Sequence, residues 1–157
     1  MIDLTIARAI HVLSIVIWMG GVAFVTLILI PALRKNYLEQ EQLIIFNMIE
    51  KSFAKIARLT VVLAGISGLY MTYKLNSWDK FTNPHQFWMS AMALIWVMFA
   101  LALFIVEPFF IKNHGRMVKE DSGIRNLRKT QIIHLIILIL SLVTIFCSVL
   151  GAHGFFY

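Results

Sequence analysis

Histidine is the side chain of this sequence best suited to chemistry inside an apolar environment. The chain has five histidines, and His11 lies within a run of 25 residues, Ala9 to Leu33, that carries no formal charge. Imidazole is a common ligand of haem iron and of copper, and ionisable groups inside membrane spans tend to be functional. His11 is therefore the first candidate for a ligand or proton-handling role. The other candidates are His85, His114, His134 and His153.

Trp18 and a glycine pair accompany His11 on the same segment. Trp18 follows His11 by seven residues, almost on one helical face, because seven steps of about 100° nearly complete two turns. This spacing places Trp18 well below the headgroup level at which tryptophans usually anchor a span. Gly20 and Gly21 follow directly. We interpret this segment as the wall of a binding site rather than as a simple anchor.

The composition predicts an integral membrane protein. The 157 residues are 60% hydrophobic, with a mean hydropathy of +0.82, which is typical of a polytopic membrane protein and not of a soluble domain. The net charge of +6 comes from basic residues in segments that flank apolar spans, so we exclude nucleic acid as a partner. We expect an all-α, four-helix membrane bundle in one domain, residues 1–157, with spans at about 5–33, 57–75, 85–108 and 130–152.

The connecting segments complete this picture. We expect residues 34–58 to form either an amphipathic segment near the membrane surface or a solvated connecting helix, and residues 112–129 to form a basic loop. Asn83 and Pro84 predict the start of the third span, as N-cap and first helical residue.

The basic residues predict the orientation. Eleven of the 14 Lys and Arg residues lie between spans one and two or between spans three and four, and three lie on the other side. The positive-inside rule then places both termini on the non-cytoplasmic side. We expect a multi-pass protein of a bacterial cell membrane.

This topology sorts the histidines by depth. His11, His85 and His153 fall in the outer half, on three different spans, whereas His114 and His134 fall in the cytoplasmic half. Imidazoles from facing helices commonly hold haem iron in membrane bundles, and small residues make room for the macrocycle. Gly65 and Gly68 belong to a small-residue stripe of the second span that provides either such room or close helix packing.

The four histidines other than His11 also have a plainer interpretation. His85 and His153 are equally consistent with polar residues of the headgroup region, His114 with a solvated loop, and His134 with a hydrogen bond to a neighbouring helix. Copper is a second metal to consider, because thioethers and imidazoles together suit Cu(I). Four methionines accompany the outer histidines, namely Met19, Met71, Met89 and Met92.

The segment His11-Val-Leu-Ser-Ile-Val-Ile-Trp18-Met-Gly20-Gly21 resembles the first helix of the CopD (copper resistance protein D) and HemJ-type membrane proteins. The resemblance implies a four-helix membrane bundle, haem b in the HemJ branch and copper handling in the CopD branch, and it maps His11 onto the family's first-helix histidine. HemJ proteins have a lysine shortly after a tryptophan of the third span, where this chain has Met92.

We therefore predict a haem b-binding membrane protein with electron-transfer or redox activity at the outer face. Quinol or a periplasmic redox protein would be the partner, and a homo-oligomer is a further option. His11 is one predicted axial ligand, His85 the preferred second and His153 its substitute, with Trp18, Gly65 and Gly68 lining the cofactor. His134 and His114 form a weaker second pair. The alternatives are a CopD-type copper-binding or transport protein and a HemJ-type protoporphyrinogen oxidase.

Overall fold

The computed structural model describes residues 1–35, 40–106 and 120–156, and throughout these ranges the regular structure is helical. Four of its helices are long and apolar enough to cross a membrane: Ile2–Leu33, Lys51–Lys74, Pro84–Val106 and Gln131–Ala152. The prediction of an all-α four-helix membrane protein is confirmed, and the chain is a multi-pass membrane protein.

The first span is one rod made of three segments. The helix α1 (Ile2–Phe24) continues through a π-helical turn, η1 (Val25–Leu29), into α2 (Ile30–Lys35). The wide turn precedes Pro31, which has no N–H and whose ring would clash with a carbonyl four residues earlier in a regular helix. The span therefore passes Pro31 without ending.

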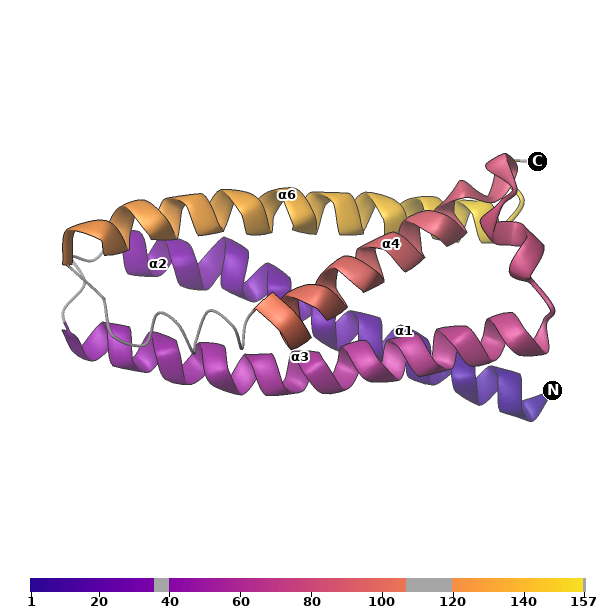
Figure 1. Ribbon diagram of the computed structural model, residues 1–157, viewed down its shortest axis with the longest axis horizontal. Coiled ribbons are helices and arrows are strands. Elements are labelled where there is room, and N and C mark those ends of the chain that lie inside the picture. Colours follow the sequence, from indigo (N-terminus) through magenta and orange to yellow (C-terminus); the bar gives the residue numbers. More distant parts are fainter. Residues whose placement is uncertain (36–39, 107–119, 157) are drawn as a thin grey trace.

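The second and fourth spans belong to longer helices than the sequence predicted. The helix α3 (Gln40–Lys74) is continuous over 35 residues, so the segment from residue 40 onward continues the axis of the span instead of lying across it (Figure 1). This favours the solvated connecting helix over a surface-lying segment. The helix α6 (Glu120–Ala152) likewise includes residues 120–129, which were predicted as loop. Residues 36–39 and 107–119 are outside the described part.

A short linker joins α3 to the third span. It contains two 3₁₀ turns, η2 (Trp78–Phe81) and η3 (Pro84–Gln86), and the third span then runs through α4 (Phe87–Leu101) and a second π-helical turn, η4 (Ala102–Val106). The Asn83 side chain accepts a hydrogen bond of 2.9 Å from the backbone N–H of His85. Asn83 is thus the predicted N-cap, although the first turn is 3₁₀.

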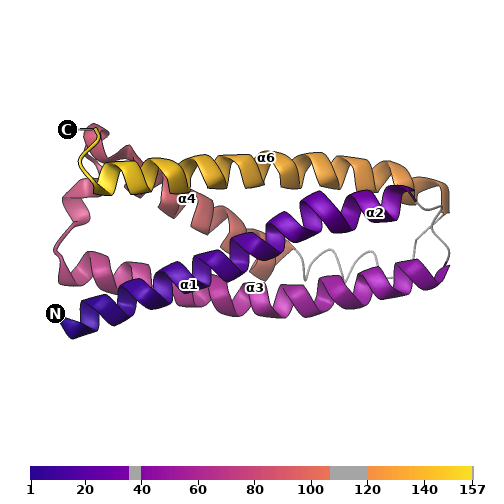
Figure 2. The same ribbon diagram turned by 180° about the vertical axis from the view of Figure 1, so that it is seen from behind.

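The four spans form two helix pairs. The helices α1 and α3 cross in close contact, α4 lies against α6, and both termini lie at one end of the bundle, called here the terminal end (Figures 1 and 2). Aromatic rings seated on glycines make several of these contacts. Phe53 of α3 lies on Gly21 of α1, and Trp88 of α4 lies on Gly151 of α6.

An apolar layer joins the two pairs in the middle of the bundle. The indole of Trp18 packs edge-on against Phe99 of α4, with ring centroids 4.6 Å apart. Val61 of α3 and Leu138 of α6 are buried in the same cluster. Residues of all four spans therefore meet at the depth of Trp18.

Candidate functional site

His11 lies between α1 and α3, on the terminal-end side of the apolar layer. Its Nδ1 atom is 2.9 Å from the backbone carbonyl oxygen of Ala64 and 3.1 Å from the hydroxyl oxygen of Ser67. The Ser67 hydroxyl is itself within 2.6 Å of the carbonyl oxygen of Leu63, to which it donates. Both groups that face Nδ1 can therefore accept a proton.

These contacts fix the tautomer of His11. A carbonyl oxygen has no proton to give, so Nδ1 carries the hydrogen and donates it to Ala64. In the neutral ring, Nε2 then has the free lone pair. A metal-bound histidine usually donates its other ring N–H to a carbonyl, carboxylate or water, which orients the ring and makes the ligand nitrogen more basic. His11 has this arrangement.

Gly68 and Gly65 are filled by side chains of the chain itself. A Cβ atom at Gly68 would lie 3.2 Å from Cε1 of His11, and one at Gly65 would overlap the indole of Trp96. The small-residue stripe thus provides close packing, the second of its two predicted roles. Gly68 makes room for the imidazole ring.

Two tryptophans of the central region differ in their hydrogen bonding. Trp96 donates from Nε1 to the carbonyl oxygen of Val61 at 2.8 Å. Trp18 is 4% exposed, and its Nε1 has no acceptor within the described part of the chain. A buried donor without a partner costs about 1–3 kcal/mol. Trp18 is therefore deep, as predicted, and carries an unsatisfied donor.

His85 and His153 lie at the terminal end, on exposed positions. His85 is in η3, ahead of α4, and His153 follows α6, where its Nδ1 donates to the carbonyl oxygen of Val149 at 2.8 Å. His11 lies beside Gly68, one turn nearer the terminal end than the contact of Trp96 with Gly65. His85 precedes Trp96 by 11 residues. After subtraction of the turn that separates His11 from the level of Trp96, His85 lies roughly 12 Å of helix beyond the level of His11.

Of the two remaining predicted ligands, the described one lies on the other side of the apolar layer. His134 is half-buried in α6, and His114 is outside the described residues. Over the described ranges, no group of three or more His, Cys, Asp or Glu side chains is arranged to hold a metal ion. The structure thus brings His11 together with Gly68 and Ser67, and leaves His85 and His153 apart from it.

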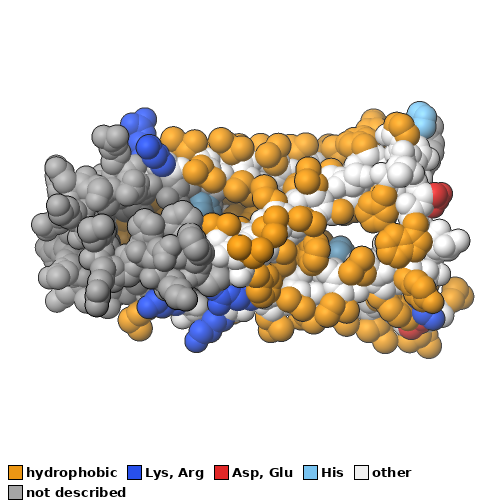
Figure 3. Space-filling view, viewed as in Figure 1, with side chains coloured by type: hydrophobic (Ala, Val, Ile, Leu, Met, Phe, Trp, Pro, Cys, Tyr) orange, Lys and Arg blue, Asp and Glu red, His pale blue; other side chains and the backbone are white. Residues whose placement is uncertain are grey.

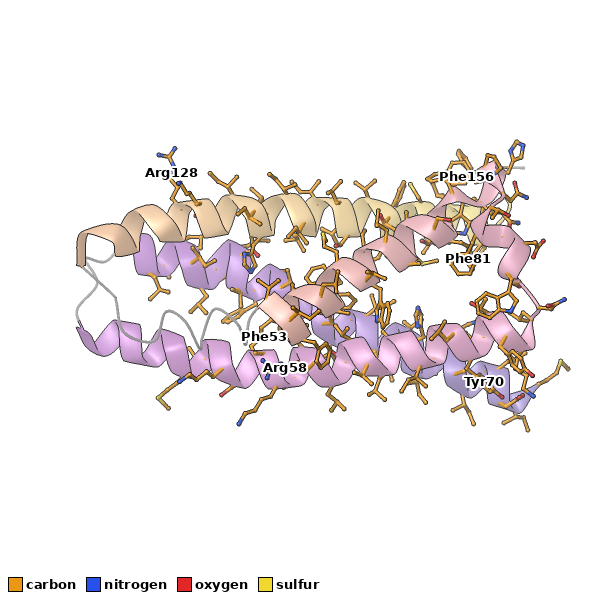
Figure 4. All side chains as sticks on the ribbon, viewed as in Figure 1. Phe53, Arg58, Tyr70, Phe81, Arg128 and Phe156 are labelled. Carbon is orange, nitrogen blue, oxygen red and sulfur yellow. The ribbon has the colours of Figure 1, made fainter. Side chains whose placement is uncertain are left out.

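The sequence did not predict a set of polar contacts at the two π-helical turns. Arg58 of α3 donates from Nε to the carbonyl oxygen of Leu103 in η4 at 3.2 Å, and Gln131 of α6 lies 3.5 Å from the carbonyl oxygen of Thr26 in η1. Arg58 is at the crossing of α3 with the end of the third span (Figure 4). The Arg58 side chain turns into the bundle. Pro31 was the available sequence signal for the first of these turns.

A hollow separates the helix pairs toward the terminal end. The helices α3 and α4 touch at Gly65 and Trp96 and then diverge (Figure 1). The space-filling view shows the hollow between them, with a histidine side chain at its edge (Figure 3). No residue in the most apolar stretch of the third span is buried, whereas 39% of the residues in the most apolar stretch of the second span are buried.

Residues 13–119, about two thirds of the chain, match the family described as a domain of unknown function, DUF4149. The chain belongs to the DUF4149 family. Neither a curated protein nor a solved structure matches it. The matched range contains Trp18, Gly65, Gly68 and His85, and it begins two residues after His11.

Proposed function

We propose that this DUF4149 protein binds haem b in the terminal-end half of the bundle, with His11 as an axial ligand, and that it performs electron transfer or redox chemistry there. The observation that carries the proposal is the hydrogen bond from Nδ1 of His11 to the carbonyl oxygen of Ala64, 2.9 Å long. It leaves Nε2 as a preoriented, unprotonated nitrogen inside a membrane span. The resemblance of the first helix to CopD and HemJ-type proteins supports the same assignment.

The shape of the bundle between α3 and α4 also supports the proposal. A macrocycle requires a gap between helices near the ligand. The helices α3 and α4 diverge toward the terminal end (Figure 1) from the contact of Trp96 with Gly65, about one turn from Gly68, on which His11 packs. Haem would supply one-electron redox chemistry there. Ala64 and Ser67 would hold the ligand ring, and the apolar layer around Trp18 would keep water from the site.

His85 is the preferred second axial ligand and His153 its substitute. His85 would have to approach His11 from the terminal end, about two turns of helix away along the bundle. A six-coordinate, low-spin spectrum is expected if one of them binds, and a five-coordinate, high-spin spectrum if His11 is the sole protein ligand. The variants His85→Ala and His153→Ala would identify the second ligand by conversion from low to high spin.

The setting of the site follows from the basic residues. Their eleven-to-three distribution favours both termini, and therefore the His11 half of the bundle, on the non-cytoplasmic side of a bacterial cell membrane. The redox partner would then be a quinol in the membrane or a redox protein outside it.

A visible spectrum combined with metal analysis tests the proposal. The purified protein is expected to show a Soret band that shifts on reduction, and His11→Ala is expected to abolish it, whereas the control His134→Ala should retain it. A folded protein that contains neither haem nor a Soret band after expression with added haem precursor would contradict the proposal. Stoichiometric copper without haem would instead support the CopD-type alternative.

A further inference from the structure

Three basic residues share one face of α3, toward the end of the bundle opposite the termini. Lys51, Lys55 and Arg58 follow one another at intervals of four and three residues in a continuous helix, so their side chains leave the helix on the same side. The space-filling view shows Lys and Arg side chains gathered along α3 at this end (Figure 3). We call these three residues the basic face of α3.

The basic face lies at the level of the lipid headgroups. The second span, Lys51–Lys74, has 24 residues, which is roughly 36 Å of helix and slightly more than the hydrocarbon core of a bilayer, about 30 Å. Lys51 and Lys74 therefore lie at the two boundaries of the core. Lys55 lies one turn inside, and its long side chain reaches back to the boundary.

The bundle uses Arg58 for its own packing but neither of the two lysines. Nε of Arg58 donates to the carbonyl oxygen of Leu103 at 3.2 Å, which holds the end of the third span beside the basic face (Figure 4). Lys51 and Lys55 are exposed, and neither forms an ion pair or a hydrogen bond within the described part of the chain. Side chains four residues apart on a helix are neighbours, so two ammonium groups at this spacing can hold one phosphate between them.

The same face of α3 continues as an apolar ridge toward the middle of the membrane. Val62, Ile66 and Leu69 follow Arg58 at helical spacing, and their side chains are 39%, 61% and 56% exposed. Exposed side chains at this depth contact acyl chains. Cations at the headgroup level, followed by an apolar ridge on the same face, match a phospholipid from its phosphate to its acyl chain. A soluble anion or an acidic peptide would use the cations alone.

We propose that the basic face of α3 binds a phospholipid with a net negative charge. The phosphate lies between the ammonium groups of Lys51 and Lys55, and an acyl chain lies along Val62 and Ile66. Gly68, on which His11 packs, is 13 residues from Lys55, which is roughly 20 Å of helix. The lipid site and the His11 site are therefore separate, and haem-free protein should bind the lipid equally well.

A second basic pair, on α6, provides the matched control. Arg128 and Lys129 are also exposed toward the end opposite the termini (Figure 4). Adjacent residues of a helix are about 100° apart and do not face each other, so this pair cannot hold one phosphate between its side chains. The double variants Lys51→Gln/Lys55→Gln and Arg128→Gln/Lys129→Gln remove the same charge from the same end of the protein. Only the first removes the proposed phosphate ligands.

Native mass spectrometry tests the proposal on the full chain in detergent, titrated with phosphatidylglycerol or with phosphatidylcholine of the same acyl chains. We expect the first phosphatidylglycerol to bind roughly tenfold more tightly than the first phosphatidylcholine, equivalent to about 1.4 kcal/mol. Lys51→Gln/Lys55→Gln should abolish this preference, and Lys51→Arg/Lys55→Arg should retain it. Arg128→Gln/Lys129→Gln should also retain it.

Three results would overturn the proposal. Equal affinities of the unmodified protein for the two lipids, or equal losses in the two glutamine variants, would show that the basic face does not select an anionic lipid. Displacement of the lipid by an equal concentration of glycerol 1-phosphate, which has the charge without the chains, would identify a site for soluble phosphate instead. A dimer that is lost in Lys51→Gln/Lys55→Gln, with lipid binding unchanged, would assign the face to a second copy of the chain.

Discussion

Nδ1 of His11 and the carbonyl oxygen of Ala64 are 2.9 Å apart, across the crossing of α1 and α3. This one contact decides which nitrogen of the ring is available, because the carbonyl can only accept. It also shows what the glycine at position 68 contributes, since a Cβ there would lie 3.2 Å from Cε1 of the same ring. The close approach of α1 and α3 and the orientation of the His11 ring therefore depend on the same residues.

The hydroxyl of Ser67 allows this orientation to be tested separately from ligation. Ser67→Ala removes one acceptor 3.1 Å from Nδ1 and leaves the Ala64 carbonyl in place. We expect haem to bind with about tenfold lower affinity, the lower end of the usual effect of losing an outer-shell partner, and with a shifted midpoint potential. Haem titration and potentiometry measure both.

Thr60→Ala is a suitable control for Ser67→Ala. Thr60 is also buried in α3 and also donates to carbonyl oxygens of its own helix, those of Ile56 and Ala57. This variant should leave haem affinity and potential unchanged. Equal losses in the two variants would indicate general loosening of α3 and contradict a specific role for Ser67.

The adjacent glycines of α1 provide a test of the packing. Gly21→Ala places a methyl group in the ring of Phe53, whereas a Cβ at Gly20 has no atom within 4 Å. We expect Gly21→Ala to destabilise the protein by about 1–3 kcal/mol through overpacking. Gly20→Ala should be neutral or slightly stabilising, because alanine is the better helix former.

The two variants are compared by their thermal denaturation midpoints in the same detergent. Similar midpoints for Gly20→Ala and Gly21→Ala would contradict the close approach of α1 and α3 at this level. The comparison is informative because both residues occupy the same helix and differ only in the face that they present.

Periodicity and charge were sufficient to predict the spans, because apolar length and basic flanks reflect the bilayer directly. They also predicted the depth of Trp18. They did not predict where α3 begins, because a helix extends past the bilayer wherever no Pro or Gly stops it, as from Gln40. The sequence placed three histidines in one half of the bundle, and this prediction concerned their depth alone. Whether His85 faces His11 depends on rotation and on the 3₁₀ turn at Pro84, which helical spacing does not encode.

Replacement of Trp18 and of Trp96 by phenylalanine should change the stability of the protein to different extents. Trp96→Phe removes the 2.8 Å hydrogen bond to the carbonyl oxygen of Val61, whereas Trp18→Phe removes a donor that has no acceptor among the described residues. Both changes remove a similar volume of ring. In haem-free protein we expect Trp96→Phe to cost about 1 kcal/mol more than Trp18→Phe.

Denaturation of both variants with and without bound haem measures this difference. A Trp18→Phe variant that is the more destabilised one in haem-free protein would show that its indole N–H has an acceptor after all. A cost that arises only in the haem-loaded protein would show that the bound group supplies the acceptor.

The orientation of the bundle can be tested with single cysteines. Thr82 is exposed in the linker at the terminal end, and Lys51 is exposed on α3 at the opposite end. In a Cys147→Ser background, Thr82→Cys should react with a membrane-impermeant maleimide in intact cells, and Lys51→Cys should react only after the cells are opened, because basic residues are retained on the cytoplasmic side. Mass shift of the purified protein reports the reaction. The reverse pattern would place His11 in the cytoplasmic half and would remove the basis for redox chemistry at the outer face.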